Sequence, residues 1–221
     1  MVFLHGYLAD KRCFYNQITY FERDFEVFAP DFKGFGENKN MRYPYSLDDY
    51  VEDIVEYFYA KGIRRPSVIA HSFGGRVAIK LASSRENFFD KLVLTGCAGL
   101  KPRKSLKKRV KNSIFKLLKP FLPKEKLARF YSSDYLSLSP IMRRSFIKIV
   151  NEHLDNRLRL IKNSTLIVHG ERDYETPLYM AKRLNRGIKN SRLIVVKEAG
   201  HFVFLDKPNT FNMEVGKFLL S

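Results

Sequence analysis

A serine lies in a glycine-rich turn directly after a short apolar run, in the stretch VIAHSFGG at residues 68–75. Small residues stand two positions before and after Ser72, at Ala70 and Gly74, and a helical pattern follows. Such a serine can be a helix N-cap. It can also be a nucleophile, because a sharp strand-to-helix turn lifts the hydroxyl above the sheet only where flanking side chains are small. The strict G-x-S-x-G pattern has glycine at Ala70, and a methyl group there is a mild departure.

Two more residues follow apolar runs and could relay a proton from the serine. Asp173 comes just after TLIVHG (165–170), and His201 follows RLIVV (192–196) in the loop before the last helix. The chain order Ser72, Asp173, His201, with each residue after a separate strand, is that of one arrangement of the Ser-His-Asp triad. The order and the strand-end positions together predict nucleophilic catalysis of acyl transfer.

Each of these two residues also has a simpler interpretation. Asp173 beside Arg172 could be a solvated turn residue, and a lone loop histidine is often a surface residue. Glu171 and Glu175 are weaker candidates for the acid, because they sit nearer the strand end and the start of the next helix.

Acyl transfer also needs hydrogen-bond donors aimed at the developing oxyanion. These are commonly the backbone N–H after the nucleophile and one from an early strand-to-helix loop. The backbone N–H groups of Phe73 and of Tyr7, in FLHGYL (3–8), fit these places. His5 is then expected to brace the loop from beneath rather than to act as a base. This chemistry requires no metal and no organic cofactor.

The spacing of apolar residues, together with helix-capping residues and glycines, predicts the elements that position these residues. Residues 46–62 read as a helix, with Ser46 as N-cap and Gly62 as the stop. Short apolar runs between helical stretches predict strands at 2–5, 25–30, 67–71, 91–96, 165–170 and 192–196. Alternating strands and helices predict a doubly wound, mostly parallel α/β sheet, which binds ligands beyond the carboxyl ends of its strands.

About sixty residues interrupt this alternation before the strand at 165–170. They show several helical patterns and no convincing strand, and they are far more than a crossover needs. We predict an inserted helical cap at 101–160, with the core formed by 1–100 and 161–221.

These motifs together resemble the α/β-hydrolase superfamily, in its cap-bearing serine hydrolase form. The resemblance covers nearly the whole chain except the cap, and rests on the HG of the first loop, DFKGFGEN (31–38), AHSFGG, HGERD and GHFVFLDKP. It implies the following roles: Ser72 the nucleophile, His201 the general base and acid, Asp173 its orienter, and Tyr7 and Phe73 the oxyanion donors.

The same resemblance narrows the chemistry. Related dehalogenases and epoxide hydrolases use an aspartate nucleophile, and dehalogenases hold the halide with tryptophan, which this chain lacks. What remains is hydrolysis of an ester, thioester, amide or C–C bond of a small, apolar substrate through an acyl-enzyme, or acyl transfer to another acceptor. A non-catalytic small-molecule binder on the same fold is the alternative from another class.

Two features depart from the family pattern. Lys33 and Asn38 replace the arginine and serine more usual in the 31–38 turn. Members also usually begin with a β-hairpin ahead of the first strand seen here, so we expect a shortened start or a fragment. Without that hairpin, the strand at 25–30 would expose an apolar edge prone to aggregation or dimerisation.

The distribution of charge limits the kinds of partner that the chain is expected to bind. Residues 101–160 contain 17 Lys+Arg and 4 Asp+Glu, most of the net charge of +17. The basic amphipathic stretch SLKKRVKNSIFKLLKPFL could meet an anionic membrane surface or draw in an acidic substrate, but a solvated face of a cap helix is favoured. No nucleic-acid motif accompanies the aromatic residues of this region, which would instead line an acyl pocket: Phe115, Phe121, Phe130, Tyr131 and Tyr135.

The remaining features concern compartment. Cys13 and Cys97 lack the spacing of a disulfide scaffold or zinc site, so both are expected to be free, buried thiols. The sequence has no secretory signal pattern and no apolar run long enough to span a bilayer. We therefore expect a cytoplasmic protein.

Overall fold

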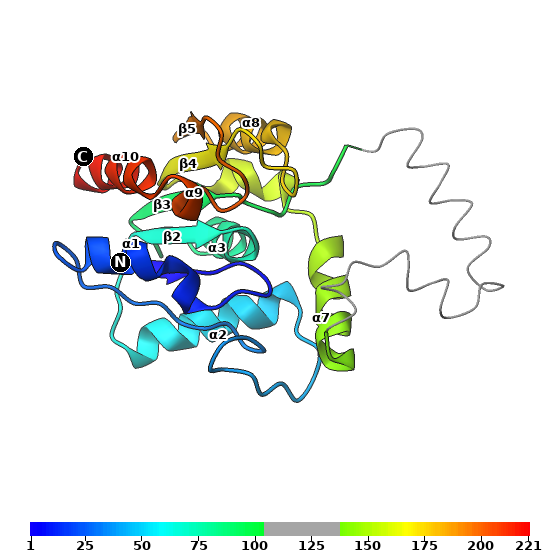
Figure 1. The fold of residues 1–221 in the computed structure, drawn as a ribbon. Coiled ribbons are helices and arrows are strands. Elements are labelled where there is room, and N and C mark those ends of the chain that lie inside the picture. The colour runs from blue at the N-terminus through cyan, green and yellow to red at the C-terminus, as the bar shows by residue number, and fades with distance from the viewer. Residues whose placement is uncertain (104–137) are drawn as a thin grey trace.

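A parallel sheet forms the centre of the computed structural model, which describes residues 1–103 and 138–221 (Figure 1). Within these ranges the sheet has five strands in the order β1-β2-β3-β4-β5, and all neighbouring strands are parallel. The strands are β1 (Val2–Leu4), β2 (Val68–His71), β3 (Lys91–Thr95), β4 (Ser164–Gly170) and β5 (Ser191–Val196).

Side chains of β1 and β2 alternate between two buried clusters, one on each face of the sheet. In β1, Val2 and Leu4 belong to one cluster and Phe3 to the other. In β2, Ala70 and Ile69 divide in the same way. Both faces are therefore covered, which explains why these strands read as continuous apolar runs.

Helices cover both faces. The face with Val2 and Leu4 lies under α2 (Leu47–Ala60), α3 (Phe73–Ser84) and α8 (Leu178–Gly187). The face with Phe3 lies under η1 (Lys11–Phe14), α1 (Tyr15–Phe21), α9 (Val203–Asp206) and α10 (Pro208–Leu220). This arrangement confirms the predicted α/β fold with a doubly wound parallel sheet.

The predicted helix at 46–62 is confirmed as α2. The Ser46 side chain accepts from the Asp49 N–H, while the Asp49 carboxylate accepts from the Ser46 N–H at 2.6 Å, which makes a capping box. The helix ends before Gly62, whose φ of 65° is easily reached without a side chain. Local sequence chemistry thus sets both ends of this helix.

The strand predicted at 25–30 is wrong as a strand, because the structure has only an isolated bridge between Val2 and Phe28. Phe28 N–H donates to Met1 O, and Phe28 O accepts from Phe3 N–H, both at 2.9 Å. The next ladder bond would need an N–H from residue 30, and Pro30 has none. The other five predicted strands correspond to β1–β5.

The predicted cap at 101–160 is described only in part. Its described portion contains α7 (Pro140–Asn151) and the 3₁₀ helix η3 (Asp155–Leu160). The basic stretch at 105–122 and the five aromatic residues predicted to line an acyl pocket lie outside the described residues, so those predictions stand as predictions. Among the described helices, none combines the length and the apolar composition needed to cross a bilayer.

Candidate active site

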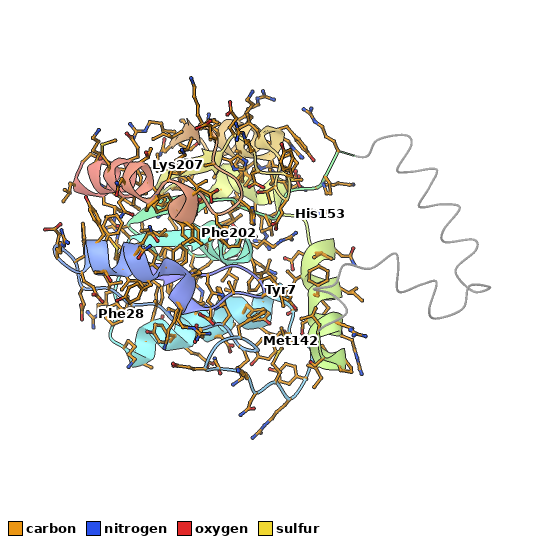
Figure 2. All side chains as sticks on the ribbon, viewed as in Figure 1. Tyr7, Phe28, Met142, His153, Phe202 and Lys207 are labelled. Atoms are coloured by element: carbon orange, nitrogen blue, oxygen red, sulfur yellow. The ribbon has the colours of Figure 1, made fainter. Side chains whose placement is uncertain are left out.

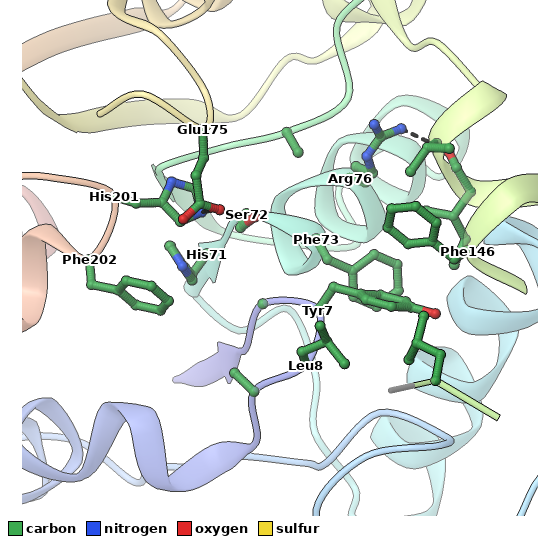
Figure 3. A pocket seen from close by; sticks show the side chains of 16 residues that line it. Tyr7, Leu8, His71, Ser72, Phe73, Arg76, Phe146, Glu175, His201 and Phe202 are labelled. Carbon is green, nitrogen blue, oxygen red and sulfur yellow. Dashed lines mark hydrogen bonds and ion pairs between the residues drawn. The ribbon is translucent and has the colours of Figure 1, made fainter. Parts of the chain in front are cut away.

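The predicted site residues gather beside β1, where segments that follow it in the chain pair with both of its edges. From β1 the chain passes to the bridge at Phe28 on one side, and β2 pairs with β1 on the other. Such a switch point opens a crevice at the carboxyl ends of the strands. A cavity of about 530 Å³ lies there, and Tyr7, Ser72, Phe73 and His201 are among its lining residues (Figure 3).

Ser72 occupies a strained turn between β2 and α3. Its φ of 48° and ψ of −105° place a non-glycine residue at positive φ. Two backbone bonds hold it there: Ser72 N–H donates to Thr95 O at 3.0 Å, and Ala98 N–H donates to Ser72 O at 3.2 Å. Both partners belong to β3 and the loop after it, so the neighbouring strand fixes the turn.

Small residues allow β1, β2 and α3 to meet at this turn. A Cβ on Gly74 would lie 2.3 Å from Leu4 O, and one on Gly6 would lie 2.9 Å from His71 Cδ2. Both distances are too short for a real side chain. Ala70 is fully buried in β2, so its methyl group is accommodated and the predicted departure from the strict glycine pattern is compatible with the elbow.

Asp173 and His201 come together from the loops after β4 and β5. Asp173 Oδ2 lies 2.9 Å from His201 Nδ1, a hydrogen bond in which the imidazole N–H donates. The carboxylate oxygens also accept from Glu175 N–H at 2.9 Å, from Thr176 N–H at 2.8 Å and from the Thr176 hydroxyl at 2.7 Å. With Nδ1 as the donor, Nε2 is left unprotonated and able to accept a proton.

The environment of Asp173 favours its charged form. Its side chain is only 3% exposed, and burial by itself raises the pKa. Hydrogen bonds from His201 and Thr176 outweigh burial and lower the pKa to about 2. The carboxylate is therefore ionised at neutral pH and able to hold the His201 tautomer. No sequence signal singles out Thr176, because its two hydrogen bonds to Asp173 depend on the turn that the loop adopts.

The two weaker acid candidates are placed differently. The Glu171 carboxylate accepts from Glu198 N–H at 3.2 Å rather than from the imidazole. The Glu175 carboxylate lies 3.5 Å from Nε2 of His201, on the opposite ring edge from Asp173. Asp173 is thus the carboxylate at Nδ1, and Glu175 is a cavity-lining acid whose position the sequence did not predict.

Ser72 and His201 line the same cavity without a direct hydrogen bond. Within residues 1–103 and 138–221, the Ser72 hydroxyl has no hydrogen-bond partner. His71, the last residue of β2 and the residue before the serine, has its ring centroid 4.7 Å from that of His201, so the end of β2 lies close to the loop that carries His201. In unliganded enzymes the bond from nucleophile to base is often long and shortens when substrate binds.

The two predicted oxyanion donors border the serine. Tyr7 follows Gly6, where an added Cβ would lie 3.5 Å from Ser72 Cβ, and Phe73 is the first residue of α3. Neither backbone N–H has an acceptor in the part of the chain that the structure describes. Two free N–H groups beside a candidate nucleophile are what an oxyanion requires.

The Tyr7 side chain joins its loop to α7. Its hydroxyl donates to Met142 O at 3.1 Å, and Figure 2 labels Tyr7 in the first loop and Met142 in this helix. Its ring also makes edge contacts with Phe35 and Phe73, with centroids 4.8 and 5.4 Å away. The loop that carries one oxyanion donor is therefore packed on several sides.

His5 braces the same loop, as the sequence predicts. Its Nδ1 donates to Gly6 O at 2.7 Å and its Nε2 accepts from Phe32 N–H at 3.0 Å, so backbone groups use both ring nitrogens. The imidazole is 1% exposed, and burial lowers its pKa.

Two further residues of the cavity were missed by sequence reasoning. His71 is fully buried, its Nδ1 donates to Thr95 O at 3.1 Å, and its Nε2 has no partner in the described ranges. Arg76 lies four positions after Ser72, which is the spacing of one helical turn and could have placed it at the cavity.

Neither cysteine forms a disulfide. Cys97 is buried and Cys13 half-buried, which confirms free thiols and corrects the expectation that both are buried. Among the described residues, no three histidine, cysteine, aspartate or glutamate side chains group in a way that could hold a metal ion.

Comparisons with known proteins agree with the fold. A model of the alpha/beta hydrolase family matches residues 1–214. An AB hydrolase superfamily protein from Bacillus subtilis (strain 168) is 26% identical over an alignment 242 residues long, gaps included. The alignment covers 99% of this chain and 90% of that protein.

Two other similar proteins have names that state an activity. The 2-hydroxymuconate semialdehyde hydrolase of Pseudomonas putida is 26% identical over 216 residues, covering 87% of this chain and 76% of that protein. Among solved structures, an esterase from Exiguobacterium antarcticum superposes with a TM-score of 0.80 at 26% identity, covering 100% of this chain and 91% of that chain.

Proposed function

Because the chain belongs to the alpha/beta hydrolase family, we propose that it is a serine hydrolase that cleaves a carboxylic ester or a related acyl bond of a small substrate. The hydrogen bond between Asp173 and His201, at the edge of the cavity that Ser72 borders, is the observation that carries the proposal. Hydrolase chemistry on this fold is also supported by the relatives.

The first half-reaction would form an acyl-enzyme. His201 Nε2 accepts the proton of Ser72 as the hydroxyl oxygen attacks the substrate carbonyl. Asp173, ionised at neutral pH, stabilises the imidazolium that forms. The N–H groups of Tyr7 and Phe73 donate to the oxyanion. When the tetrahedral intermediate collapses, the bond to the leaving group breaks, and that group takes the proton from His201.

The second half-reaction returns the free enzyme. Water enters where the leaving group was, and His201 Nε2 removes one of its protons as its oxygen attacks the acyl carbon. Collapse of the second intermediate breaks the bond to Ser72 and returns the proton to the serine oxygen. The acid product leaves, and no group is oxidised or reduced.

The cavity lining favours an apolar acyl or leaving group. Most of its described side chains are aromatic or aliphatic, among them Tyr7, Phe73, Phe146, Ile149 and Phe202. Because one relative is named as a semialdehyde hydrolase and a similar structure as an esterase, esters, thioesters, amides and C–C bonds all belong in the substrate screen.

The test is hydrolysis of p-nitrophenyl acetate and butyrate by the wild-type chain, Ser72→Ala and a matched serine control, Ser83→Ala. Ser83 is at the far end of α3, where its hydroxyl bonds to Lys80 O at 2.9 Å. We expect Ser72→Ala to lose at least about 10³-fold in kcat, as removal of a triad nucleophile does in other enzymes, and Ser83→Ala to keep its rate. Undiminished turnover by a folded Ser72→Ala would overturn the proposal.

A further inference from the structure

The cavity wall contains a buried cation that the proposed reaction does not use. Arg76 lies on α3, one helical turn after Ser72, and is only 9% exposed. Figure 3 shows its guanidinium on one side of Ser72 and the Glu175 carboxylate on the other. A charged group that is nearly removed from water needs compensating partners.

The partners of Arg76 compensate it only in part. Its Nη1 donates to Ile149 O at 2.9 Å and to Glu152 O at 2.8 Å, both at the end of α7. The Glu152 carboxylate is taken by Lys80, whose Nζ is 2.5 Å away. Among the described residues, no carboxylate pairs with Arg76, and the bonds to α7 use Nη1 alone. Nε and Nη2 have no acceptor there and are not fully buried.

The guanidinium stays charged in this setting. Burial lowers the pKa of Arg76 from its ordinary value, yet arginine remains protonated in proteins. Its planar fork suits two parallel hydrogen bonds to one carboxylate, and such charge-assisted pairs are stronger than neutral bonds. The cavity wall thus contains guanidinium N–H donors that are able to bind an anion.

We propose that Arg76 binds a carboxylate carried by the substrate, so that the chain prefers acyl substrates with an anionic group a few bonds from the scissile carbonyl. The inference rests on the proposed function and names the substrate class of the same cavity. The two charges set the orientation: the anion lies at Arg76, away from Glu175, while the carbonyl lies at Ser72.

A competing role for Arg76 is purely structural. A cation that binds the last carbonyls of α7 also interacts favourably with the helix dipole. Loss of that contact would disturb the cavity for every substrate alike. Recognition of an anion, in contrast, predicts a loss confined to substrates that carry one, and this difference decides between the two roles.

The experiment compares kcat/KM for two matched substrates, the p-nitrophenyl hemiester of adipate and its neutral methyl ester. The wild-type chain should prefer the hemiester at least about tenfold. Arg76→Met should lower kcat/KM for the hemiester by about 10- to 100-fold, the cost of one charged hydrogen-bonded contact, and for the methyl ester by less than threefold. Arg76→Lys, which keeps the charge without the fork, should fall in between.

Arg85→Met is the control, because Arg85 ends the same helix and pairs with Glu52 at 2.9 Å on the surface. It should leave the ratio of the two substrates unchanged. Equal losses on both substrates in Arg76→Met, or in Arg76→Lys if the methionine variant does not fold, would overturn the inference. So would a wild-type chain with no preference for the hemiester.

A binding measurement separates this inference from the proposed function. Calorimetry of adipate with Ser72→Ala needs no turnover, and we expect binding that is weakened at least tenfold when Arg76→Met is added. Hydrolysis failing on both esters while adipate still binds through Arg76 would overturn only the hydrolase proposal. Adipate binding that is absent, or indifferent to Arg76, would overturn the inference.

Discussion

Replacing Asp173 by asparagine tests how the carboxylate serves His201. The change keeps the size of the side chain but puts an NH₂ group or a neutral oxygen where Oδ2 accepts from His201 and from the Thr176 hydroxyl. If the amide donates to Nδ1, the imidazole proton moves to Nε2. His201 can then no longer take the proton of Ser72.

The structure gives the size of the effect. The pKa of Asp173 falls from 3.8 to about 2, so the folded protein favours the carboxylate by roughly 2.5 kcal/mol at about 1.36 kcal/mol per pKa unit. Asp173→Asn should therefore lower the free energy of unfolding at pH 7 by about 2 kcal/mol. The wrong tautomer should lower kcat by about 10⁴-fold, as the equivalent change does in a serine protease.

The pH dependence follows from the sign of the shift. Because the folded pKa lies below the ordinary value, the stabilisation is present above about pH 4 and is lost as the pH falls through about 2. Urea unfolding at pH 7 and pH 3 should show a smaller acid loss in Asp173→Asn than in the wild-type chain.

The assay is p-nitrophenyl acetate turnover, with Glu171→Gln and Glu175→Gln as matched acid-to-amide controls in the same loop. Both controls should stay within about tenfold of the wild-type rate, because neither carboxylate contacts Nδ1. The reasoning would be refuted if Asp173→Asn kept its rate, or if Glu175→Gln showed the larger loss, which would make Glu175 the acid.

Two further predictions concern the turn at Ser72. Gly74→Ala would put a Cβ 2.3 Å from Leu4 O, so we expect a loss of about 1–3 kcal/mol of stability and reduced turnover. Gly62→Ala, which has open space but a positive φ, should cost about 1 kcal/mol and keep full activity; the reverse ranking in thermal melts and turnover would contradict this. His71 has its pKa lowered to about 3 by burial and by the nearby His201, so the unfolded chain takes up its proton first and stability falls from about pH 6.5 towards pH 3. In urea unfolding measured from pH 6.5 to pH 3, His71→Leu should lose less stability than the wild-type chain. An equal loss in both would show that the lowered pKa of His71 does not cause the decline.

The alternation of strands and helices predicted most of the fold, and the rule that functional residues follow the carboxyl ends of parallel strands predicted where the site residues lie. Ser72, Asp173 and His201 each follow a strand, and the carboxyl ends of parallel strands meet at one edge. The structure brings Asp173 and His201 into hydrogen-bond contact, while the catalytic roles of all three stay predictions. Local patterns sufficed here because each residue is positioned by its own strand.

What the sequence did not predict depends on contacts between distant segments. The run at 25–30 is apolar enough for a strand, but Pro30 removes the next ladder bond to β1, which hydropathy does not register. Arg76 resembles any basic helix residue until the end of α7 covers it. The position of Glu175 at Nε2 likewise follows from the path of its loop.

The central claim is that Ser72 is an activated nucleophile, and covalent labelling tests it most directly. Intact-mass spectrometry after treatment with a fluorophosphonate should show a single adduct on the wild-type chain, an adduct on Ser83→Ala, and none on Ser72→Ala. An adduct of equal yield on Ser72→Ala, or no adduct on a wild-type chain shown to be folded by circular dichroism, would contradict the account.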